Sequence, residues 1–518
     1  MNPLLLTDGY KTGHHQQYPE GTELVYSNFT PRSNKYAPSG CDAVVSFGEQ
    51  MTMMQIHEAF EKEFFQHGLE RDLMLVKRKN DPTYLVPVVE EMKKELSMYL
   101  GSDYDVTHFQ ELWDLGYLPI HVKAIDEGSL VPIRVPVLTI YNTHPKFYWV
   151  TNYLETILSN LLWKPMTSAT IAHQYRKILT KWQEKTDAEK SWFVDWQGHD
   201  FSMRGMDSVE AVISSGVSHL TSFLGSDSLP TIYGARKYYH AEGMVCGSVN
   251  ATEHSVMCAG GKEDELETFR RLIKTYPTGI LSVVSDTWDL WKVCTSHVKE
   301  LKDEILSRDG KLVIRPDSGD PVDILCGLNT NPKALEAFKY YDDVDEWDRP
   351  EFKGVIELLW DVFGGEVNEQ GYKVLDPHIG AIYGDSITLE RAEEICRRLA
   401  EKGFASTNVV LGIGSFTYQY NTRDTFGFAM KATYVEVNGE AREIFKDPIT
   451  DDGIKKSATG LLSVFKNDVD GKYELYDHCD WERENQGELK TIYLNGEFKN
   501  RTTLEDVRNR LKESLKNS

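Results

Sequence analysis

Three aspartates each lie just beyond a short run of apolar, β-forming residues. Asp286 ends the segment ILSVVSD, Asp317 lies three residues after the run LVI, and Asp385 ends the segment IGAIYGD. Uncharged runs of this kind are typical of strands buried on both faces of a sheet. A carboxylate at such a position can accept hydrogen bonds from sugar hydroxyls or bind a divalent cation. We therefore expect these acids at the carboxyl ends of strands, around a polar ligand.

The stretch KLVIRPDSGDP, residues 311–321, adds groups that bind anions. Pro316 fixes one backbone dihedral angle and Gly319 permits unusual ones, so the loop can expose backbone N–H groups. These amides and the guanidinium of Arg315 can bind phosphate oxygens beside the carboxylate of Asp317. The combination suits a phosphorylated sugar.

The order of the elements indicates how such groups meet. A further run, VLGIGS, ends at Ser415, and helical patterns over 287–306 and 389–399 follow two of the strands. Alternating strands and helices predict a parallel α/β sheet or barrel, in which ligands collect at the carboxyl ends of the strands. Four such strand ends in one place would form an active site.

The segment HDFSMRG, residues 199–205, fits the same plan. It lies between a possible strand at 192–196 and a predicted helix at 208–223. Phe201 could stack on a flat ring and Arg204 could bind phosphate. On local grounds alone, a core role for Phe201 and a solvated surface role for Arg204 are the simpler interpretations.

The flanking segments predict a different kind of domain. Residues 118–142 alternate apolar and polar side chains, which favours antiparallel strands. We expect further strands at 23–29, 428–437, 461–465, 472–476 and 490–494, and helices at 51–66, 86–100, 147–163, 168–185 and 504–515. The sequence thus predicts an α/β chain with an irregular, TIM-like α/β barrel domain at 166–424. Residues 1–165 and 425–518 should together form an α+β domain around an antiparallel sheet.

Composition excludes several classes of protein. A formal charge of −23 over 518 residues argues against a nucleic-acid or anionic-membrane surface. Seven scattered cysteines without a CxxC pair disfavour a disulfide framework or a zinc site. The first residues, MNPLLLTDGYK, lack the basic region of a signal peptide, and no apolar run reaches the length of a membrane span. We expect a cytoplasmic enzyme.

The familiar catalytic motifs HExxH, GxSxG and GxxxxGK[ST] are absent, and no GxGxxG opens a helix. What remains is a set of acids, arginines and glycine turns, and it can hold a sugar that carries both a monophosphate and a pyrophosphate. Loss of pyrophosphate passes through an oxocarbenium-like state, which needs nearby carboxylates, Mg²⁺ on the leaving group and a flat slot for an aromatic nucleophile.

Ten short motifs extend over nearly the whole chain: DGYK from Asp8, YSNF from Tyr26, HDF and RG at 199–205, FLGSD ending at Asp227, EHS around His254, SVVSD ending at Asp286, IRPDSG ending at Gly319, GD at 384–385, TRD around Arg423 and FKDP from Phe445. In this order and spacing they resemble the family of nicotinamide phosphoribosyltransferases. Each motif is weak alone, but together they are specific. The resemblance implies synthesis of nicotinamide mononucleotide from nicotinamide and phosphoribosyl pyrophosphate with Mg²⁺.

The resemblance also implies roles for residues at the pyridine. Phe201 and Tyr10 of a second subunit would enclose the ring. Asp227 would accept a hydrogen bond from the carboxamide, which a nicotinate carboxylate cannot donate. His254 would be catalytic and phosphorylated by ATP as an optional cosubstrate.

A further set would hold the sugar and its phosphates. Arg204 and Arg315 would face phosphates, and Asp317, Gly384 and Asp385 would hold the ribose. Asp286 and Asp317 would be catalytic and bind Mg²⁺. The groups at the 5′-phosphate would be Ser415 and Arg423, with Lys431 and Arg32 contributing across a homodimer that shares its active sites.

Three alternatives stay open. The fold could serve nicotinate instead, although Asp227 argues against it. The chain could be a non-catalytic nucleotide-binding or signalling protein, which the full set of acids disfavours. A barrel glycosidase using two of the aspartates would need no phosphate-binding arginines.

Overall fold

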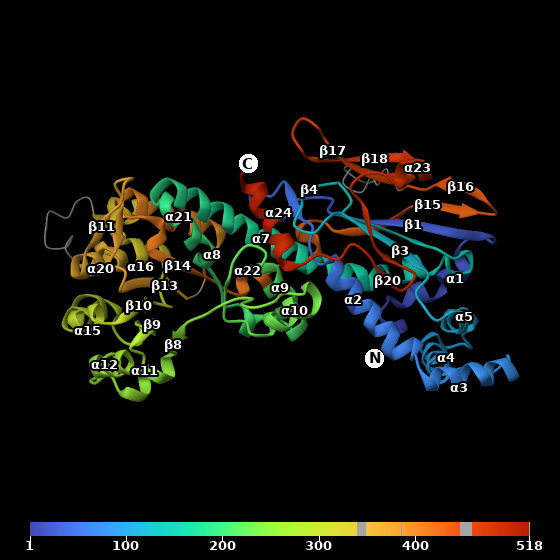
Figure 1. The fold of residues 1–518 in the computed structure, drawn as a ribbon, viewed down its shortest axis with the longest axis horizontal. Helices are drawn as coiled ribbons and strands as arrows, with labels where there is room; N and C mark the ends of the chain where they lie inside the picture. Colours follow the sequence, from blue (N-terminus) through green and yellow to red (C-terminus); the bar gives the residue numbers. More distant parts are fainter. Residues whose placement is uncertain (339–348, 385, 446–457, 517–518) are drawn as a thin grey trace. The chain divides into compact units, whose positions relative to one another are not determined.

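The computed structural model describes residues 1–338, 349–384, 386–445 and 458–516, and they form two compact units (Figure 1). Unit 1 comprises residues 1–170, 237–241 and 421–518, and unit 2 comprises residues 171–236 and 242–420. The sequence places functional domain boundaries after residues 165 and 424, and these remain predictions.

Unit 2 is built on a seven-stranded parallel sheet with the strand order β7-β6-β14-β13-β10-β9-β8. The strands are β6 (Gly198–Asp200), β7 (Gly225–Ser226), β8 (Asn250–Ala251), β9 (Thr278–Val284), β10 (Asp309–Arg315), β13 (Ile379–Tyr383) and β14 (Val409–Ile413). A bridge between Gly225 and Gly247 links β7 to the segment before β8, so the sheet is a partly closed barrel. The prediction of an irregular α/β barrel is confirmed, and four predicted strands are neighbours in it.

Helices follow the strands of unit 2 and share its buried core. They include α11 (His254–Gly260), α12 (Glu265–Thr275), α16 (Pro321–Cys326), α20 (Val355–Phe363), α21 (Leu389–Glu401) and α22 (Ser415–Gln419). A further helix, α9 (Val209–His219), follows β6. Leu312 and Ile314 of β10 are fully buried, as expected for a central parallel strand.

Two expectations for unit 2 are wrong. Residues 188–193 and 194–197 form η5 (Ala188–Phe193) and α8 (Val194–Gln197), so the strand expected at 192–196 is helical and β6 begins at Gly198. Short apolar runs do not distinguish strand from helix, and here Trp192 is exposed while Val194 is buried. The helix expected at 287–306 is divided into α13 (Leu290–Lys292), the π-turn η7 (Val293–His297), α14 (Val298–Glu300) and α15 (Lys302–Leu306).

Unit 1 contains an antiparallel sheet that combines early and late segments of the chain. Its order is β16-β15-β1-β5-β3-β19-β20. The strands are β1 (Thr22–Thr30), β3 (Ile120–Ala124), β5 (Leu138–Asn142), β15 (Ala429–Val437), β16 (Glu440–Glu443), β19 (Lys490–Leu494) and β20 (Glu497–Phe498). In Figure 1 the blue strand β1 lies beside the orange strand β15, with Phe29 opposite Met430. The predicted sheet from N- and C-terminal segments is confirmed.

Smaller elements complete unit 1. They are β2 (Ala43–Val45), β4 (Leu130–Pro132), the hairpin β17 (Leu461–Lys466) and β18 (Tyr473–Cys479), and the helices α2 (Glu49–Ala59), α3 (Leu69–Asn80), α4 (Pro87–Leu100), α5 (Thr107–Leu115) and α24 (Leu504–Lys516). The helix α7 (Glu155–Thr186) runs continuously through Pro165, where two separate helices were expected. Leu162 and Met166 are fully buried, and the Pro165 ring packs against Gly48, so packing on both sides holds the helix together at the proline.

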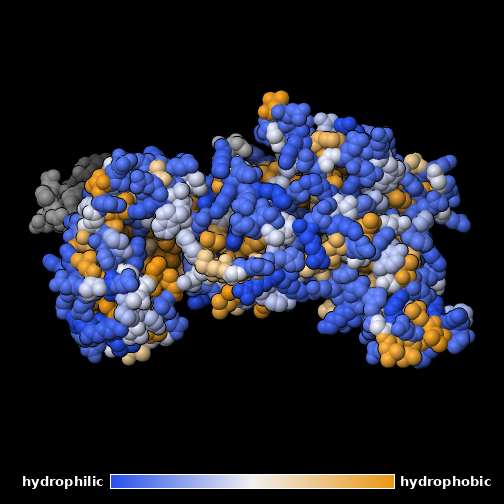
Figure 2. Space-filling model, in the orientation of Figure 1, coloured by the Kyte–Doolittle hydropathy of each residue, from blue (hydrophilic) through white to orange (hydrophobic). Residues whose placement is uncertain are grey.

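The surface of the described residues is mostly polar. Figure 2 shows an apolar area over α3, where Leu69, Leu73 and Val76 are more than half exposed. Among the described residues, no helix combines the length and the hydropathy that crossing a membrane requires.

Candidate functional site

All seven parallel strands of unit 2 carry a predicted site residue at or just beyond their carboxyl ends. Phe201 follows β6, Asp227 follows β7, His254 follows β8, Asp286 follows β9, Arg315 ends β10 and Asp317 follows it, Gly384 follows β13, and Ser415 follows β14. Because neighbouring parallel strands end at the same edge of a sheet, these residues form one candidate site.

Asp286 holds the loop that follows β10. Its Oδ2 accepts hydrogen bonds from the N–H of Asp317 (2.9 Å), the N–H of Ser318 (2.7 Å) and the hydroxyl of Ser318 (2.5 Å). The other oxygen, Oδ1, is buried and accepts no hydrogen bond from any described residue. One carboxylate therefore both fixes the loop and presents an acceptor that the described residues leave unused.

His254 lies beside both acids. Its Nε2 is 3.9 Å from Asp286 Oδ1 and 3.9 Å from Asp317 Oδ2, and its Nδ1 is 3.2 Å from the hydroxyl of Thr287. The His254 side chain is about half exposed, so a ligand can reach it.

Arg315 and Gly384 define the position of the Asp317 carboxylate. Arg315 donates through Nη2 to the carbonyl of Thr252 (2.6 Å), and its Nε is 3.8 Å from Asp317 Oδ1. A Cβ atom on Gly384 would collide with the same Asp317 oxygen. The glycine thus permits a close approach that no other residue allows.

A second cluster lies at the ends of β6 and β7. His199 Nε2 is 2.8 Å from Asp227 Oδ1, and Ser248 donates its hydroxyl to the same oxygen. The rings of His199 and Phe201 have centroids 4.6 Å apart. Burial opposes ionisation of the Asp227 carboxyl, but the bonds from His199 and Ser248 and the charge of Arg315 outweigh it and lower its pKa. Asp227 is therefore a charged acceptor beside an aromatic ring.

Ser415 lies against Gly205, the residue that follows Arg204. Phe201 donates its N–H to the carbonyl of Ile413 (3.0 Å), and a Cβ on Gly205 would collide with the Ser415 hydroxyl. The Arg204 side chain is exposed. This arrangement leaves a guanidinium and a hydroxyl accessible to an anion.

Four predicted residues belong to unit 1. Arg32 donates through Nε to the carbonyl of Gly427 (2.9 Å), and Phe428 donates its N–H to the carbonyl of Arg423 (3.1 Å). Arg32 and Arg423 therefore adjoin one turn, and Lys431 lies on β15 just beyond it. Tyr10 is 66% exposed in η2 (Gly9–Gly13). The roles of these four residues stay predictions.

Asp385 lies outside the described residues, so its predicted role stays a prediction. Over the described ranges, no three or more His, Cys, Asp or Glu side chains gather in a way that could hold a metal ion. The predicted binding of Mg²⁺ by Asp286 and Asp317 stays a prediction.

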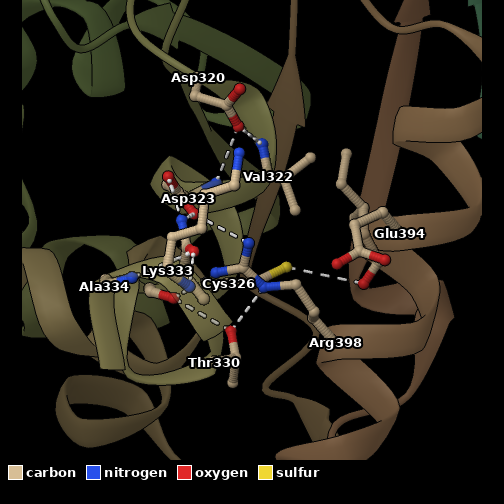
Figure 3. Close-up of polar contacts among 12 residues, drawn as sticks. Asp320, Val322, Asp323, Cys326, Thr330, Lys333, Ala334, Glu394 and Arg398 are labelled. Atoms are coloured by element: carbon tan, nitrogen blue, oxygen red, sulfur yellow. Dashed lines mark hydrogen bonds and ion pairs between the residues drawn. The ribbon is translucent and has the colours of Figure 1, made fainter. Parts of the chain in front are cut away.

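Further hydrogen bonds hold the end of the Asp317 loop that leads into α16. Asp320 accepts from the N–H groups of Val322 and Asp323 and begins α16. Figure 3 shows Arg398 reaching from α21 to Asp323 (2.8 Å) and Thr330 (2.6 Å). The loop is thus held by Asp286 at its start and by two helices at its end.

Some site residues had no signal of their own in the sequence. Ser248, Thr252 and Thr287 lie in loops, and only the closed sheet brings them to Asp227, Arg315 and His254. The signal for His199 was its place in the segment HDF, two residues before Phe201, but its contact with Asp227 depends on the pairing of β6 with β7.

Solved structures confirm the fold class. Human nicotinic acid phosphoribosyltransferase aligns with a TM-score of 0.54 at 15% identity, covering 99% of this chain and 94% of that one. Nicotinate-nucleotide pyrophosphorylase from Pyrococcus furiosus aligns with a TM-score of 0.53 at 15% identity and the same coverage. The chain therefore has the α/β fold of these two proteins.

Sequence comparison identifies the family. The model described as "Nicotinate phosphoribosyltransferase (NAPRTase) family" matches residues 196–513, and the model of the nicotinamide phosphoribosyltransferase N-terminal domain matches residues 2–71. This chain belongs to the nicotinate phosphoribosyltransferase family.

Curated relatives are named nicotinamide phosphoribosyltransferase. The protein from Acinetobacter baylyi is 49% identical over 99% of this chain and 98% of its own length. Those from Mycoplasma pneumoniae and Xanthomonas campestris pv. campestris are 34% and 32% identical, over 87% and 98% of this chain and 93% and 97% of their own lengths.

Proposed function

We propose that this chain transfers the 5-phosphoribosyl group from phosphoribosyl pyrophosphate to nicotinamide, which yields nicotinamide mononucleotide and pyrophosphate. The name and the near-complete coverage of the Acinetobacter baylyi relative support this proposal. The observation that carries it is the placement of a charged Asp227 beside Phe201 at the same sheet edge as the acids Asp286 and Asp317.

The acids suit the sugar. As pyrophosphate leaves C1, positive charge develops on the ribose ring, and fixed carboxylates at that point stabilise it. Gly384 has no side chain and so leaves room for the Asp317 carboxylate, and Arg315 next to it can take a phosphate oxygen. Ser415 and Arg204 would bind phosphate at the β14 and β6 ends.

The residues present also fit Mg²⁺. The buried Oδ1 of Asp286, which no described residue supplies with a hydrogen bond, is an acceptor of the kind that a hard cation prefers. Asp286 and Asp317 would hold the ion together with substrate oxygens. When bound, Mg²⁺ would neutralise charge on the pyrophosphate leaving group.

The pyridine would bind over Phe201, with its carboxamide donating to Asp227. A nicotinate carboxylate would place like charge against Asp227, so the cluster favours nicotinamide. Phosphorylation of His254 by ATP, a homodimer in which Tyr10, Arg32 and Lys431 reach a neighbouring site, the part of Arg423 at the 5′-phosphate and a cytoplasmic location belong to the same proposal.

The decisive experiment incubates the purified chain with phosphoribosyl pyrophosphate, Mg²⁺ and either nicotinamide or nicotinate, and it quantifies both mononucleotides by chromatography. Nicotinamide mononucleotide as the main product supports the proposal. Nicotinate mononucleotide as the main product would favour the alternative pyridine. Pyridine binding without product would favour a non-catalytic binding protein.

A further inference from the structure

His199 contacts both groups that would hold the pyridine. Its Nε2 is 2.8 Å from Asp227 Oδ1, and its ring centroid is 4.6 Å from that of Phe201, with the planes tilted by 34°. His199 is only 8% exposed. A Cβ on Gly225 would meet its Nδ1 at 2.6 Å, so the imidazole ring packs closely against Gly225. A single buried imidazole therefore couples the orientation of the stacking ring to that of the acceptor.

Ser248 completes the arrangement around Asp227. It lies between the bridge residue Gly247 and β8, and its hydroxyl donates to the same Oδ1 that His199 contacts. No described residue donates a hydrogen bond to Oδ2 of Asp227. Two donors on one oxygen fix the carboxylate plane and direct the other oxygen to a ligand.

The two donors also keep Asp227 charged. The carboxyl is partly buried, which alone would favour its neutral form, yet its pKa is lowered because His199 and Ser248 stabilise the anion. A protonated Asp227 could donate to a nicotinate carboxylate and would no longer repel it. Selection of the amide therefore requires the anion and not merely an aspartate.

We propose that His199 and Ser248 are positioning residues that set the preference for nicotinamide over nicotinate, by holding Asp227 ionised and with one oxygen facing the carboxamide. This inference rests on the proposed function and extends it from the residue that touches the pyridine to the pair that orients it. Neither residue needs to contact the ribose or the phosphates.

The test compares variants that remove or keep each donor. His199→Met removes the donor at similar volume, and His199→Gln keeps an N–H near the position of Nε2. Ser248→Ala removes the second donor, and Ser248→Thr retains it. For each variant, kcat/KM is measured with both pyridines and Kd for each pyridine is measured by calorimetry, which does not depend on turnover.

We expect His199→Met to lower the nicotinamide-to-nicotinate ratio of kcat/KM about tenfold or more, since a hydrogen bond to a charged group is lost. Ser248→Ala should lower the ratio by about threefold, as expected for the loss of one of two donors. His199→Gln and Ser248→Thr should largely restore it. KM for phosphoribosyl pyrophosphate should stay within about twofold of the wild-type value in every variant. A general loss of structure would instead raise this KM as well.

The matched control is His378→Met. His378 also pairs with an aspartate, with Nδ1 2.8 Å from Asp376 Oδ1, but this pair lies at the amino end of β13, away from the candidate site. The control should leave the ratio unchanged. Should His199→Met not fold, the exposed Ser248 still provides the test.

The outcomes separate the two proposals. If the wild-type chain makes nicotinamide mononucleotide and the ratio stays within twofold in both His199→Met and Ser248→Ala, the positioning role is wrong and the proposed function stands. If the wild-type chain makes no mononucleotide, the proposed function fails, and the calorimetric ratio alone decides the role of the pair. A wild-type chain with no preference in either measurement would overturn the inference.

Discussion

Contact between Asp317 and Gly384 makes the candidate site sensitive to a single methyl group. The glycine lies at the end of β13 and the acid just beyond β10, two neighbouring parallel strands. The carboxylate is placed by the absence of a side chain opposite it as well as by its own contacts.

Gly384→Ala should therefore displace the Asp317 carboxylate by about 1 Å and lower kcat/KM for phosphoribosyl pyrophosphate roughly 100-fold. Steady-state kinetics and thermal unfolding would measure the effects on activity and stability. Gly380→Ala in the same strand is the control, because its Cβ would meet only the flexible Lys311 side chain, at 3.2 Å. Equal losses in the two variants would contradict a specific role for the Asp317 contact.

At the residue level, the sequence predicted those groups whose chemistry shows in their immediate neighbours. Asp286, Asp317 and Arg315 come after short uncharged runs, and the structure brings all three together. Ser248 was missed because a serine in a loop has no local signature, and its partner Asp227 lies 21 residues away. Which aspartate oxygen faces outward depends on packing and could not be predicted.

At the level of elements, α16 and α21 hold the end of the loop that contains Asp317. Arg398 is 3% exposed and donates to Asp323, Thr330 and the carbonyl of Gly327. Without this buried guanidinium, three acceptors that are shielded from water would lose a hydrogen bond, which would lower the stability of the fold.

Arg398→Met should lower the free energy of unfolding by about 3 kcal/mol, because Asp323 loses its buried partner. Arg397→Met, one residue earlier, removes exposed pairs with Glu394 and Glu401 and should cost no more than about 1 kcal/mol. Urea denaturation of both variants gives the comparison. A loss for Arg397→Met as large as for Arg398→Met would refute the bracing role of Arg398.

The helices after β8 and β9 meet at a buried acid. Glu265 of α12 is 3.3 Å from His297 of η7, and burial raises the pKa of Glu265 to about 7, with Asp289 adding to and Lys292 and Lys262 opposing the shift. Because the folded pKa exceeds the unfolded value, the stability associated with the protonated acid is present below about pH 4.5 and is lost as pH rises through about 7.

The stability of Glu265→Gln relative to the wild-type chain should thus increase as pH rises from 5 to 8 and reach about 2 kcal/mol. Burial lowers the pKa of His297 as well, but His297 is present in both chains and its contribution largely cancels in the difference. Urea denaturation at several pH values measures the effect, with the exposed Glu267→Gln as control. A difference that does not vary with pH would exclude Glu265 as the titrating group.

Element prediction succeeded for the apolar, β-rich runs of unit 2 and failed at residues 192–196 and at Pro165. The strands at 280–284, 312–314, 379–383 and 409–413 are present, and so is the terminal helix. The run at 192–196 is helical because five residues cannot distinguish the two periods. Helix α7 continues through Pro165 because packing around it outweighs the intrinsic cost of a proline.

For the molecule as a whole, the proposal of shared active sites can be tested by complementation. Tyr10 in unit 1 is exposed, as a residue that serves a second subunit would be, whereas Asp317 belongs to unit 2. Tyr10→Ala and Asp317→Ala should each be nearly inactive.

Mixing the two inactive variants after gentle dissociation should restore activity, because a mixed dimer would contain one site with both residues intact. If the subunits assort at random, such sites would provide up to about a quarter of the wild-type activity. Nicotinamide mononucleotide formation and light scattering would be measured on the same samples. Mixed dimers without any activity would count against a site shared between subunits.

The pairing of β1 with β15 also has a consequence for folding during synthesis on the ribosome. About 400 residues separate the two strands. At a synthesis rate of about 5–20 residues per second, β15 is therefore synthesised tens of seconds after β1. Most of unit 2 is synthesised within this interval, and its last described strand, β14, ends shortly before β15 begins. A nascent chain therefore carries an unpaired strand edge for most of its synthesis, and truncation products that stop before residue 429 should be the species that chaperones retain or that aggregate.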